Sequence, residues 1–331
     1  MPIVTTEHFK SGNLPLSKNG IPQVSEDDYC RLKGYMLETD DIVFSRVGSV
    51  DINAHVEHVQ QGWLFSGRVL RVRPIKSVNS LCLHYVLSTE SVKRDIRNRA
   101  VGQTMPSINT PILSNTGIYM SQSEAEQKKI ANLLSLIDER ISTQNKIIDK
   151  LQSLIKGIAQ KIVHSNKTNV RLSECVECSS STLQESDVCE HGAYPVYGAN
   201  GIVGYLDNYN TEGEAVYIIK DGSGVGTVSY VTGKCSATGT LNTLQAKEGY
   251  SLQYLYYLLK VFNFEPYKTG MAIPHIYFKD YGKAKFFCPS YTEQLQYAQS
   301  LSAIDSKLLV EKNILTSLSM QKKYLLRQMF I

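Results

Sequence analysis

The sequence predicts an α+β protein that is built twice, as two similar modules that each precede a long helix, with the two helices packed antiparallel as a coiled coil. Three observations support this prediction. Apolar residues follow a heptad spacing from Ile130 to Ile162. The last 41 residues repeat that spacing. Short motifs ahead of the two helical stretches also recur, at nearly the same distance.

The first helical stretch is assigned to residues 121–165. Its apolar positions alternate in steps of four and three with no proline between them, which is the pattern of a coiled-coil seam. At 1.5 Å per residue, about 40 residues form a rod of roughly 60 Å, and such a rod exposes its seam unless another helix covers it. The positions assigned to the interface are Ile130, Leu134, Ile137, Ile141, Gln144 and Ile148.

The second helical stretch, residues 291–331, supplies that partner. A shift of 167 residues places Gln127 on Gln294 and the polar seam residue Gln144 on Glu311. Antiparallel packing about a pseudo-twofold axis then puts Gln144 opposite Glu311, where a buried polar pair would fix the register. Alternatively, both side chains face solvent where the helices diverge. The interface positions in this stretch are Leu301, Ile304, Leu308, Glu311 and Leu315.

Residues 1–120 form the first module, in which frequent turn signals separate short β-rich segments. Strands are expected at 41–45 and 67–73, and the second of these alternates apolar with basic residues, as a half-buried strand with a basic outer face does. A single helix is expected over residues 80–98.

Residues 166–290 form the second module. Strands are expected at 193–197, 202–206, 215–220 and 227–231, and a helix at 252–262. The turn Gly270–Ile276 repeats Gly102–Ile108, and Ser251 is matched to Ser80. The opening segment, residues 169–174, has no clear counterpart in the first module. We therefore expect the first module to lack its opening strand and to be truncated at its N-terminal side.

Composition and charge place few limits on the partner. The net charge of +4 and the pI of about 8.5 permit nucleic-acid binding without requiring it. The seven cysteines are irregularly spaced and are expected to be reduced, which indicates a cytoplasmic protein with no signal sequence. The most apolar stretch, residues 254–262, is far shorter than the roughly 20 residues of a membrane span, so no membrane partner is expected.

Metal and cofactor sites are not predicted. Cys175, Cys178, Cys189 and His191 are zinc-ligand types, but the second pair lacks the spacing of a zinc ribbon or finger. Whether these four residues bind a metal stays open. No motif in the chain indicates a cofactor.

Catalytic motifs are equally hard to find. The glycine-rich segment Gly222–Gly226 is not followed by the Gly-Lys-Ser/Thr of a phosphate-binding loop. A strand, not the helix of a dinucleotide fold, is expected after it, so a hairpin turn is the better interpretation. We find no paired carboxylates and no triad. The sequence therefore favours a binding protein over an enzyme.

Basic side chains interleaved with polar and aromatic ones suit contacts with DNA, because cations neutralise phosphates and polar loop residues read base edges. Any one of them can equally be an ordinary solvated residue. The candidate DNA contacts are Arg46, Arg68, Arg71, Arg94, Arg97, Gln103, Thr104, Lys220, Ser223, Lys268, His275, Tyr277 and Lys279.

The whole pattern resembles the specificity (S) subunits of type I restriction–modification systems. The resemblance covers nearly the whole chain and is carried by the Glu126–Ala131 motif with its heptads, the two glycine–proline turns, and Asp41–Arg46. It implies two target-recognition domains that each read one half of a split site in double-stranded DNA, separated by the antiparallel helices. It also implies that methyltransferase (M) subunits bind the helices, that restriction–translocase (R) subunits join the complex, and that the chain itself catalyses nothing.

Three alternatives remain open from the sequence. The family usually has a fuller first module, so this chain could be a truncated or silent specificity allele. A self-contained modification enzyme with its own recognition domains would need a cofactor motif, and weak methylation by the purified protein would reveal it. A coiled-coil scaffold that binds no DNA would fail a salt-dependent gel shift.

Overall fold

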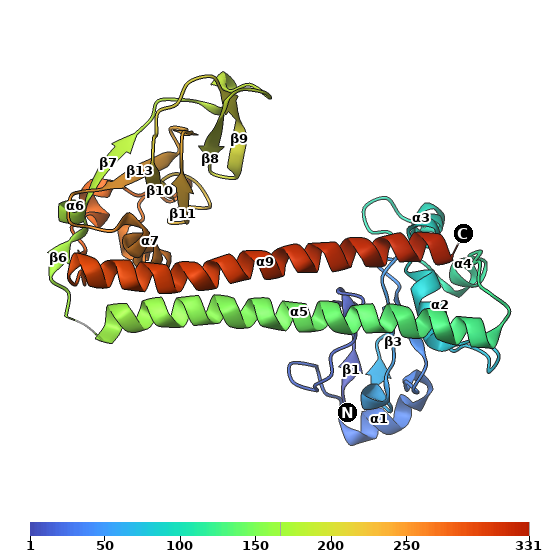
Figure 1. The fold of residues 1–331 in the computed structure, drawn as a ribbon. Helices are drawn as coiled ribbons and strands as arrows, with labels where there is room; N and C mark the ends of the chain where they lie inside the picture. Colours follow the sequence, from blue (N-terminus) through green and yellow to red (C-terminus); the bar gives the residue numbers. More distant parts are fainter. Residues whose placement is uncertain (166, 331) are drawn as a thin grey trace. The chain divides into compact units, whose positions relative to one another are not determined.

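The computed structural model describes residues 1–165 and 167–330. It contains two compact units: unit 1 is residues 1–145 with 314–331, and unit 2 is residues 146–313. The fold is α+β, with two similar domains and two long antiparallel helices, as predicted (Figure 1). None of the described helices is long and apolar enough to cross a membrane.

The long helices are α5 (Glu124–Ser165) and α9 (Tyr291–Met329). Unit 1 contains the first half of α5 with the end of α9, and unit 2 contains the second half of α5 with the beginning of α9. Each unit therefore pairs the start of one helix with the end of the other, which is antiparallel packing. In unit 1, Lys322 Nζ lies 2.5 Å from Asp138 Oδ1, whereas a parallel register with the 167-residue shift would bring Asp138 to Asp305.

The predicted seam is the least exposed face of both helices. All interface positions assigned from the sequence are buried or half-buried, and Gln144 and Glu311 are only 8% and 6% exposed. The alternative that these two polar side chains face solvent is therefore wrong. The register that pairs them stays a prediction. The predicted register puts Asp138 opposite Ser317. Ser317 lies between one and two helical turns before Lys322, which is the observed partner of Asp138.

The module of unit 1 packs a small sheet against short helices. Strand β2 is central in an antiparallel sheet of order β3-β2-β5, and β1 runs parallel to β4. Ile42 and Phe44 of β2 pack with Val86 and Ile96 from two helices in the core. The elements are β1 (Ile3–Val4), α1 (Glu26–Arg31), β2 (Ile42–Ser45), β3 (Asn53–His55), β4 (Leu64–Phe65), β5 (Val69–Val72), α2 (Ser80–Leu87), α3 (Glu90–Arg99) and α4 (Thr110–Ser114), with 3₁₀ turns at Thr6–Phe9, Lys33–Tyr35 and His58–Gln60.

The prediction of a single helix over residues 80–98 is wrong at its centre, where the helix is interrupted between α2 and α3. Ser88 Oγ donates to His84 O at 2.9 Å and Thr89 Oγ1 donates to Val86 O at 2.7 Å. Hydroxyl groups that bind the backbone in this way compete with the helical ladder. Thr89 then adopts the extended conformation of an N-cap for α3.

The module of unit 2 contains a four-stranded antiparallel sheet of order β11-β10-β13-β7 and a three-stranded sheet of order β12-β8-β9. The four strands and the helix expected from the sequence are confirmed to within two residues, but strands β7, β12, β13 and β14 were not predicted. The elements are β6 (Val170–Arg171), α6 (Leu172–Cys175), β7 (Val176–Ser180), β8 (Tyr194–Gly198), β9 (Gly201–Leu206), β10 (Glu214–Ile219), β11 (Val228–Thr232), β12 (Ser236–Ala237), β13 (Leu241–Ala246), α7 (Leu252–Lys260), α8 (Phe278–Tyr281) and β14 (Lys285–Phe286), with 3₁₀ turns at Glu185–Asp187 and Glu265–Tyr267.

The two modules share a common frame. The antiparallel pair β2–β5 corresponds to β10–β13, and the parallel pair β1–β4 corresponds to β8–β12. The expected asymmetry is also present. The described residues of unit 1 contain no counterpart of β6, α6 and β7, which open the module of unit 2.

A buried glutamine near the start of each long helix fastens the preceding module. In unit 1, Gln127 Oε1 accepts the backbone N–H of Asn79 at 2.7 Å, and Gln127 Nε2 donates to Ser121 O at 2.8 Å. In unit 2, Gln294 Oε1 accepts the N–H of Ser251 at 2.9 Å, and its Nε2 donates to a loop carbonyl in the same manner. Asn79 and Ser251 are the N-caps of α2 and α7, so Asn79, not Ser80, is the counterpart of Ser251.

A second contact binds each module one and a half heptads further along. Tyr85 donates to Asp138 in unit 1 at 2.8 Å, and Tyr257 donates to Asp305 in unit 2 at 3.3 Å. Burial, with the nearby carboxylate, raises the pKa of both phenols, so each stays a neutral donor. A lysine completes each group. It is Lys322 of α9 in unit 1, and in unit 2 it comes from the end of α7.

We predict that replacing Gln127 with leucine lowers the free energy of unfolding by about 1–3 kcal/mol, because the partly buried backbone N–H of Asn79 loses its acceptor and Ser121 O loses its donor. Urea unfolding measures the change, and hydrogen exchange should show faster exchange in α2 than in α7. The variant Gln294→Leu should reverse that pattern. Gln152→Leu is the control, because Gln152 is exposed on α5. Equal exchange in α2 and α7 for both variants would contradict the assignment.

Candidate nucleic-acid interface

In unit 1, two loops that are distant in the sequence form one surface at the end of β2. The backbone N–H of Gly48 donates to Pro106 O at 2.8 Å, and that of Ile108 donates to Arg46 O at 2.9 Å. The loop Gly102–Ile108 is therefore fixed against the turn that follows β2.

Unit 2 builds the same surface with different side chains. The N–H of Gly222 donates to Pro274 O at 2.9 Å, and that of Ile276 donates to Lys220 O at 2.9 Å. These two hydrogen bonds match the two hydrogen bonds that join the loops of unit 1. We call this arrangement the loop frame: residues 46–48 with 102–108 in unit 1, and residues 220–222 with 270–276 in unit 2.

Glycine is required where each frame closes. Gly102 and Gly270 have φ values of +102° and +88°, a left-handed conformation that other residues adopt only with strain. A Cβ atom on Gly102 would lie 2.8 Å from Met105 O, and one on Gly270 would lie 2.9 Å from His275 Nδ1. The repeated Gly…Pro motif in the sequence is thus the signature of this tight turn.

Apolar side chains occupy the tips of both frames, and sequence reasoning missed them. Met105 is 66% exposed in unit 1, while Met271 is fully exposed and Ile273 is 66% exposed in unit 2. Such side chains can contact thymine methyl groups or wedge between base steps. Their position between the glycine and the proline of a repeated turn was the available signal.

Four of the predicted contacts in unit 1 lie on or beside its loop frame. Arg46, Arg68, Gln103 and Thr104 are all exposed, and Arg46 Nη1 donates to Gly67 O at 3.2 Å. A hollow of about 430 Å³ lies beside Arg46 and Gly67. The structure therefore brings these four predicted residues together.

Arg71 and Arg97 already have partners within unit 1. Arg71 Nη1 donates to Met36 O at 2.8 Å, and its guanidinium lies 5.5 Å from the centre of the Phe65 ring. Arg97 Nη1 lies 2.5 Å from Asp51 Oδ2, and Arg97 is also paired with Glu90. These bonds raise the pKa of Arg97, and both arginines act first as structural groups.

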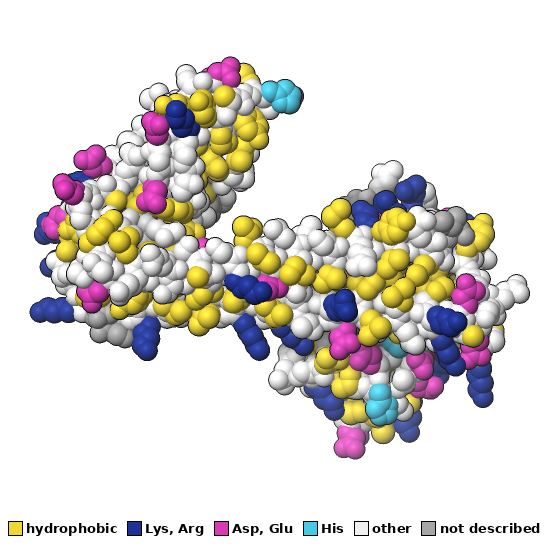
Figure 2. Space-filling view, in the orientation of Figure 1, with side chains coloured by type: hydrophobic (Ala, Val, Ile, Leu, Met, Phe, Trp, Pro, Cys, Tyr) yellow, Lys and Arg dark blue, Asp and Glu magenta, His cyan; other side chains and the backbone are white. Residues whose placement is uncertain are grey.

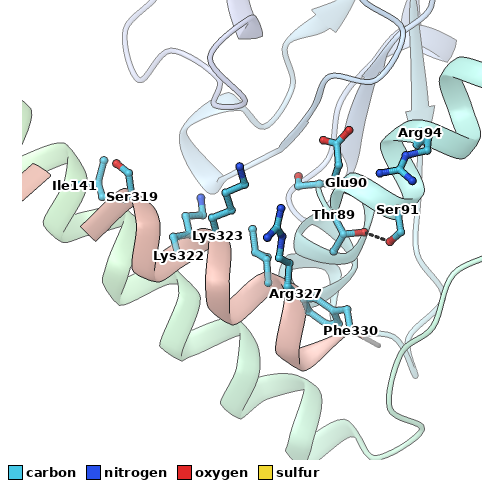
Figure 3. Close-up of a pocket in the computed structure, with 12 residues that line it drawn as sticks. Thr89, Glu90, Ser91, Arg94, Ile141, Ser319, Lys322, Lys323, Arg327 and Phe330 are labelled. Carbon is cyan, nitrogen blue, oxygen red and sulfur yellow. Dashed lines mark hydrogen bonds between the residues drawn. The ribbon is translucent and has the colours of Figure 1, made fainter. Parts of the chain in front are cut away.

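Arg94 lies in a different place, a basic hollow of about 700 Å³ between α3, α5 and α9 (Figure 3). Lys323 and Arg327 of α9 line the same hollow, and within the described chain no carboxylate is ion-paired with Arg94, Lys323 or Arg327. Thr89 and Ser91 lie at its edge, joined by a hydrogen bond of 3.2 Å. The hollow therefore combines cations with hydroxyl groups and the Glu90 carboxylate, and the sequence pattern alone does not indicate that α9 contributes to it.

The predicted contacts in unit 2 surround its loop frame. Lys279 Nζ lies 5.0 Å from the centre of the Tyr277 ring, and the rings of Tyr277 and His275 are 5.0 Å apart in an edge-to-face arrangement. Ser223 is exposed, and Lys220 is half-buried at the end of β10. These residues form one surface that combines cations, aromatic rings and a hydroxyl group.

Lys268 is the exception in unit 2. Its Nζ lies 2.6 Å from Glu265 Oε1, and its side chain is only 28% exposed. A phosphate would therefore compete with the Glu265 carboxylate for this lysine, in a surface ion pair that is weak.

The four possible zinc ligands are not assembled. Among the described residues, no group of three or more His, Cys, Asp or Glu side chains is close enough to hold a metal. Cys175 instead lies with its sulfur 3.8 Å from that of Cys288, and this contact raises the pKa of the Cys175 thiol.

We predict that Gly270→Ala destabilises unit 2 by more than about 1 kcal/mol, because alanine is strained at positive φ. Urea unfolding measures the loss. Gly157→Ala is the matched control, since Gly157 lies within α5 with open space around it and alanine should stabilise the helix by about 1 kcal/mol. A neutral effect at Gly270 would show that the turn adjusts to a side chain.

Comparison with known proteins adds a family match. A family model described as the type I restriction modification DNA specificity domain matches residues 1–153 and again 164–320. A putative type I specificity subunit of Mycoplasma genitalium is 26% identical over 274 residues, which is 75% of this chain and 70% of that protein. A putative type I restriction enzyme specificity subunit of Methanocaldococcus jannaschii is 29% identical over 175 residues, 49% of this chain and 38% of that protein.

Two solved structures share the fold. The S subunit of a type I restriction–modification system from M. genitalium superposes with a TM-score of 0.68 at 18% identity, over 99% of this chain and 91% of that one. A chain from a study of complex assembly and conformational transition of a type I system superposes with a TM-score of 0.54 at 15% identity, over 89% and 82%.

Proposed function

The chain belongs to the type I restriction–modification DNA specificity family, and on that basis we propose that it recognises a bipartite site in double-stranded DNA, with one half-site read by each module. The observation that carries the proposal is the loop frame, which is built twice with the same backbone hydrogen bonds and different side chains. A constant backbone with variable side chains is the arrangement expected of two readers with different targets.

The chemistry of each frame supports a division between phosphate and base contacts. Arg46 and Lys279 are exposed cations that can neutralise phosphates. Gln103 and Thr104 offer donors and acceptors at the tip of the unit 1 frame, and base edges in the major groove require such groups. The exposed methionines and Ile273 add apolar contacts of the kind made with thymine methyl groups.

We assign the spacing between half-sites to the two long helices. Each module is fastened near the root of its helix by the glutamine and tyrosine contacts described above. A helix rises about 1.5 Å per residue and a DNA duplex about 3.4 Å per base pair, so helix length converts directly into spacer length.

Methyltransferase subunits are proposed to dock on an apolar side of the helices that the seam leaves uncovered. On α5, Leu133, Ile147 and Leu154 recur at multiples of seven residues, each immediately before a seam position, and they are 41%, 36% and 49% exposed. Leu136, three residues after Leu133 on the same face of α5, is 58% exposed, and Tyr324 of α9 is 62% exposed. Figure 2 shows apolar side chains gathered along the helices, which is unusual for surfaces without a partner.

The chemistry of modification and cleavage is assigned to partner subunits. The restriction–translocase subunits would join through the methyltransferase complex and not through the loop frames. The resemblance to a chain from a study of type I complex assembly supports a role within such a complex. Under this proposal the chain contributes recognition and spacing and is not itself an enzyme.

The DNA proposal predicts a weaker salt dependence when cations of the unit 2 frame are removed. The double variant Lys220→Ala, Lys279→Ala should bind a duplex less tightly, and the slope of log K against log salt should fall by roughly two, because each lysine that contacts a phosphate contributes about 0.9. Fluorescence anisotropy of the full chain measures both quantities. Lys150→Ala, Lys156→Ala on α5 is the control. An unchanged slope would remove both frame lysines from the interface.

The docking proposal predicts that charges on the apolar side block assembly without unfolding the protein. Leu133→Asp, Leu136→Asp should abolish co-purification with the methyltransferase subunit, while the free energy of unfolding changes by about 0.5 kcal/mol or less, as for exposed sites. Asn132→Asp introduces one negative charge at an exposed position one residue away from Leu133 and should leave assembly intact. Normal co-purification of the double variant would place the partner elsewhere.

A further inference from the structure

We propose that Cys175 and Cys288 in unit 2 are a redox-sensitive pair of thiols, which a hydroperoxide converts into a disulfide. The bond joins the opening segment of the module to the loop that leads into α9. Neither thiol belongs to the loop frame, so the site is independent of DNA recognition. All seven cysteines are free thiols in the structure, and this pair is the one assigned to oxidation.

The sulfur atoms of the two cysteines are in contact. Cys175 Sγ lies 3.8 Å from Cys288 Sγ, although the two residues are 113 positions apart in the sequence. Cys175 is completely buried, and Cys288 is 6% exposed. The sulfurs of a disulfide are about 2.05 Å apart, so the bond forms once these two approach by a further distance of less than about 2 Å.

Hydrogen bonds hold the backbone of both cysteines in place. The carbonyl O of Cys175 accepts the N–H of Lys247 at 2.9 Å. The side chain of Asn169 accepts the N–H of Cys288 at 2.8 Å and donates to the carbonyl O of Cys288 at 2.7 Å. Asn169 lies directly before β6, the strand that opens the module. The contact between the sulfurs is therefore fixed by the backbone on both sides.

The contact makes the two thiols unequal. A hydrogen bond between the sulfurs, with burial, raises the pKa of Cys175, and the same hydrogen bond lowers the pKa of Cys288. While Cys288 is neutral, Arg171 O, 3.3 Å from Cys175 Sγ, is a second acceptor for the Cys175 proton. The thiolate is the reactive form of cysteine. Cys288 is therefore the thiol that reacts first, and Cys175 is placed to resolve the product.

Oxidation by hydrogen peroxide, a molecule small enough for a nearly buried sulfur, balances in two steps. The Cys288 thiolate attacks one peroxide oxygen, the O–O bond breaks, and the leaving hydroxide takes up the proton that Cys288 released, which leaves a sulfenic acid. The Cys175 thiol then attacks the Cys288 sulfur, and its proton leaves with the sulfenic hydroxyl group as water. The two thiols lose two electrons, and one peroxide becomes two waters. A thiol reductant reverses the bond by exchange.

The disulfide reinforces the place where the module of unit 2 meets α9. Cys175 is the last residue of α6, directly before β7, and Cys288 lies in the short loop between β14 and α9. The same loop is already held by Gln294 of α9, whose Nε2 donates to Pro289 O at 2.9 Å. A bond that closes a loop of this length removes conformational entropy from the unfolded chain, so oxidation should stabilise unit 2.

Unit 1 has a methionine where unit 2 has Cys288. The buried glutamine of unit 1 donates to Ser121 O, where that of unit 2 donates to Pro289 O, so the residue that corresponds to Cys288 is Met120. A thioether cannot form a disulfide. Oxidation should therefore slow hydrogen exchange in the module of unit 2 and leave exchange in the module of unit 1 unchanged.

The test uses the full chain, first fully reduced and then treated with a small excess of hydrogen peroxide. Peptide mapping by mass spectrometry should find the peptides of Cys175 and Cys288 linked, and thiol titration should show the loss of these two thiols. Oxidation should lower the equilibrium constant of unfolding in urea at least about tenfold. It should also slow exchange in α6 and at the start of α9. A thiol reductant should reverse all of these changes.

Matched variants identify the thiols responsible. Cys288→Ser should abolish both the linkage and the stabilisation by peroxide. Cys178→Ser removes a half-buried thiol three residues after Cys175 and should retain both effects. The peptide map of the unsubstituted chain does not depend on the folding of any variant. A different linkage, a Cys288 oxidised to sulfinic acid without a linkage, or an unfolding constant that oxidation leaves unchanged overturns the proposal.

Discussion

The buried glutamine at the root of each long helix is the contact on which the placement of each module depends. Gln127 and Gln294 are 2% and 1% exposed, and each satisfies one backbone donor and one backbone acceptor. A buried amide that lost either partner would cost about 1–3 kcal/mol. The geometry therefore tolerates little change, which explains why the same residue stands at the same heptad position in both halves of the chain.

The repeated architecture could be predicted from the sequence because heptad spacing depends only on local periodicity. Contacts that depend on tertiary distance could not. The one-residue error that matched Ser80 with Ser251 arose because either Asn79 or Ser80 can cap a helix, and the choice is settled by the bond from Asn79 N–H to Gln127 and the capping bond that the Asn79 side chain accepts from Cys82 N–H. The ion pairs of Arg97 with Asp51 and Glu90 could not be predicted either, because the two carboxylates lie 46 and 7 residues away in the sequence.

The loop frames show how a fixed backbone can present variable chemistry. Backbone bonds and a left-handed glycine hold each frame, so side chains at its tip contribute little to its shape. Gln103 and Thr104 in one frame correspond to Met271 and Ala272 in the other, with no change in the bonds beneath them. Side chains that do not support the fold are free to differ between the two frames without loss of stability.

Three different sides of each long helix have separate roles, and the composition of the helices follows from these roles. One side forms the seam, a second carries the aspartates that bind the modules, and a third presents exposed leucines such as Leu133 and Leu154. A simple two-stranded coiled coil needs only the first, with a narrow apolar stripe. The extra apolar residues weaken solubility and do nothing for the seam. Their regular spacing beside the seam suits the partner surface proposed for α5.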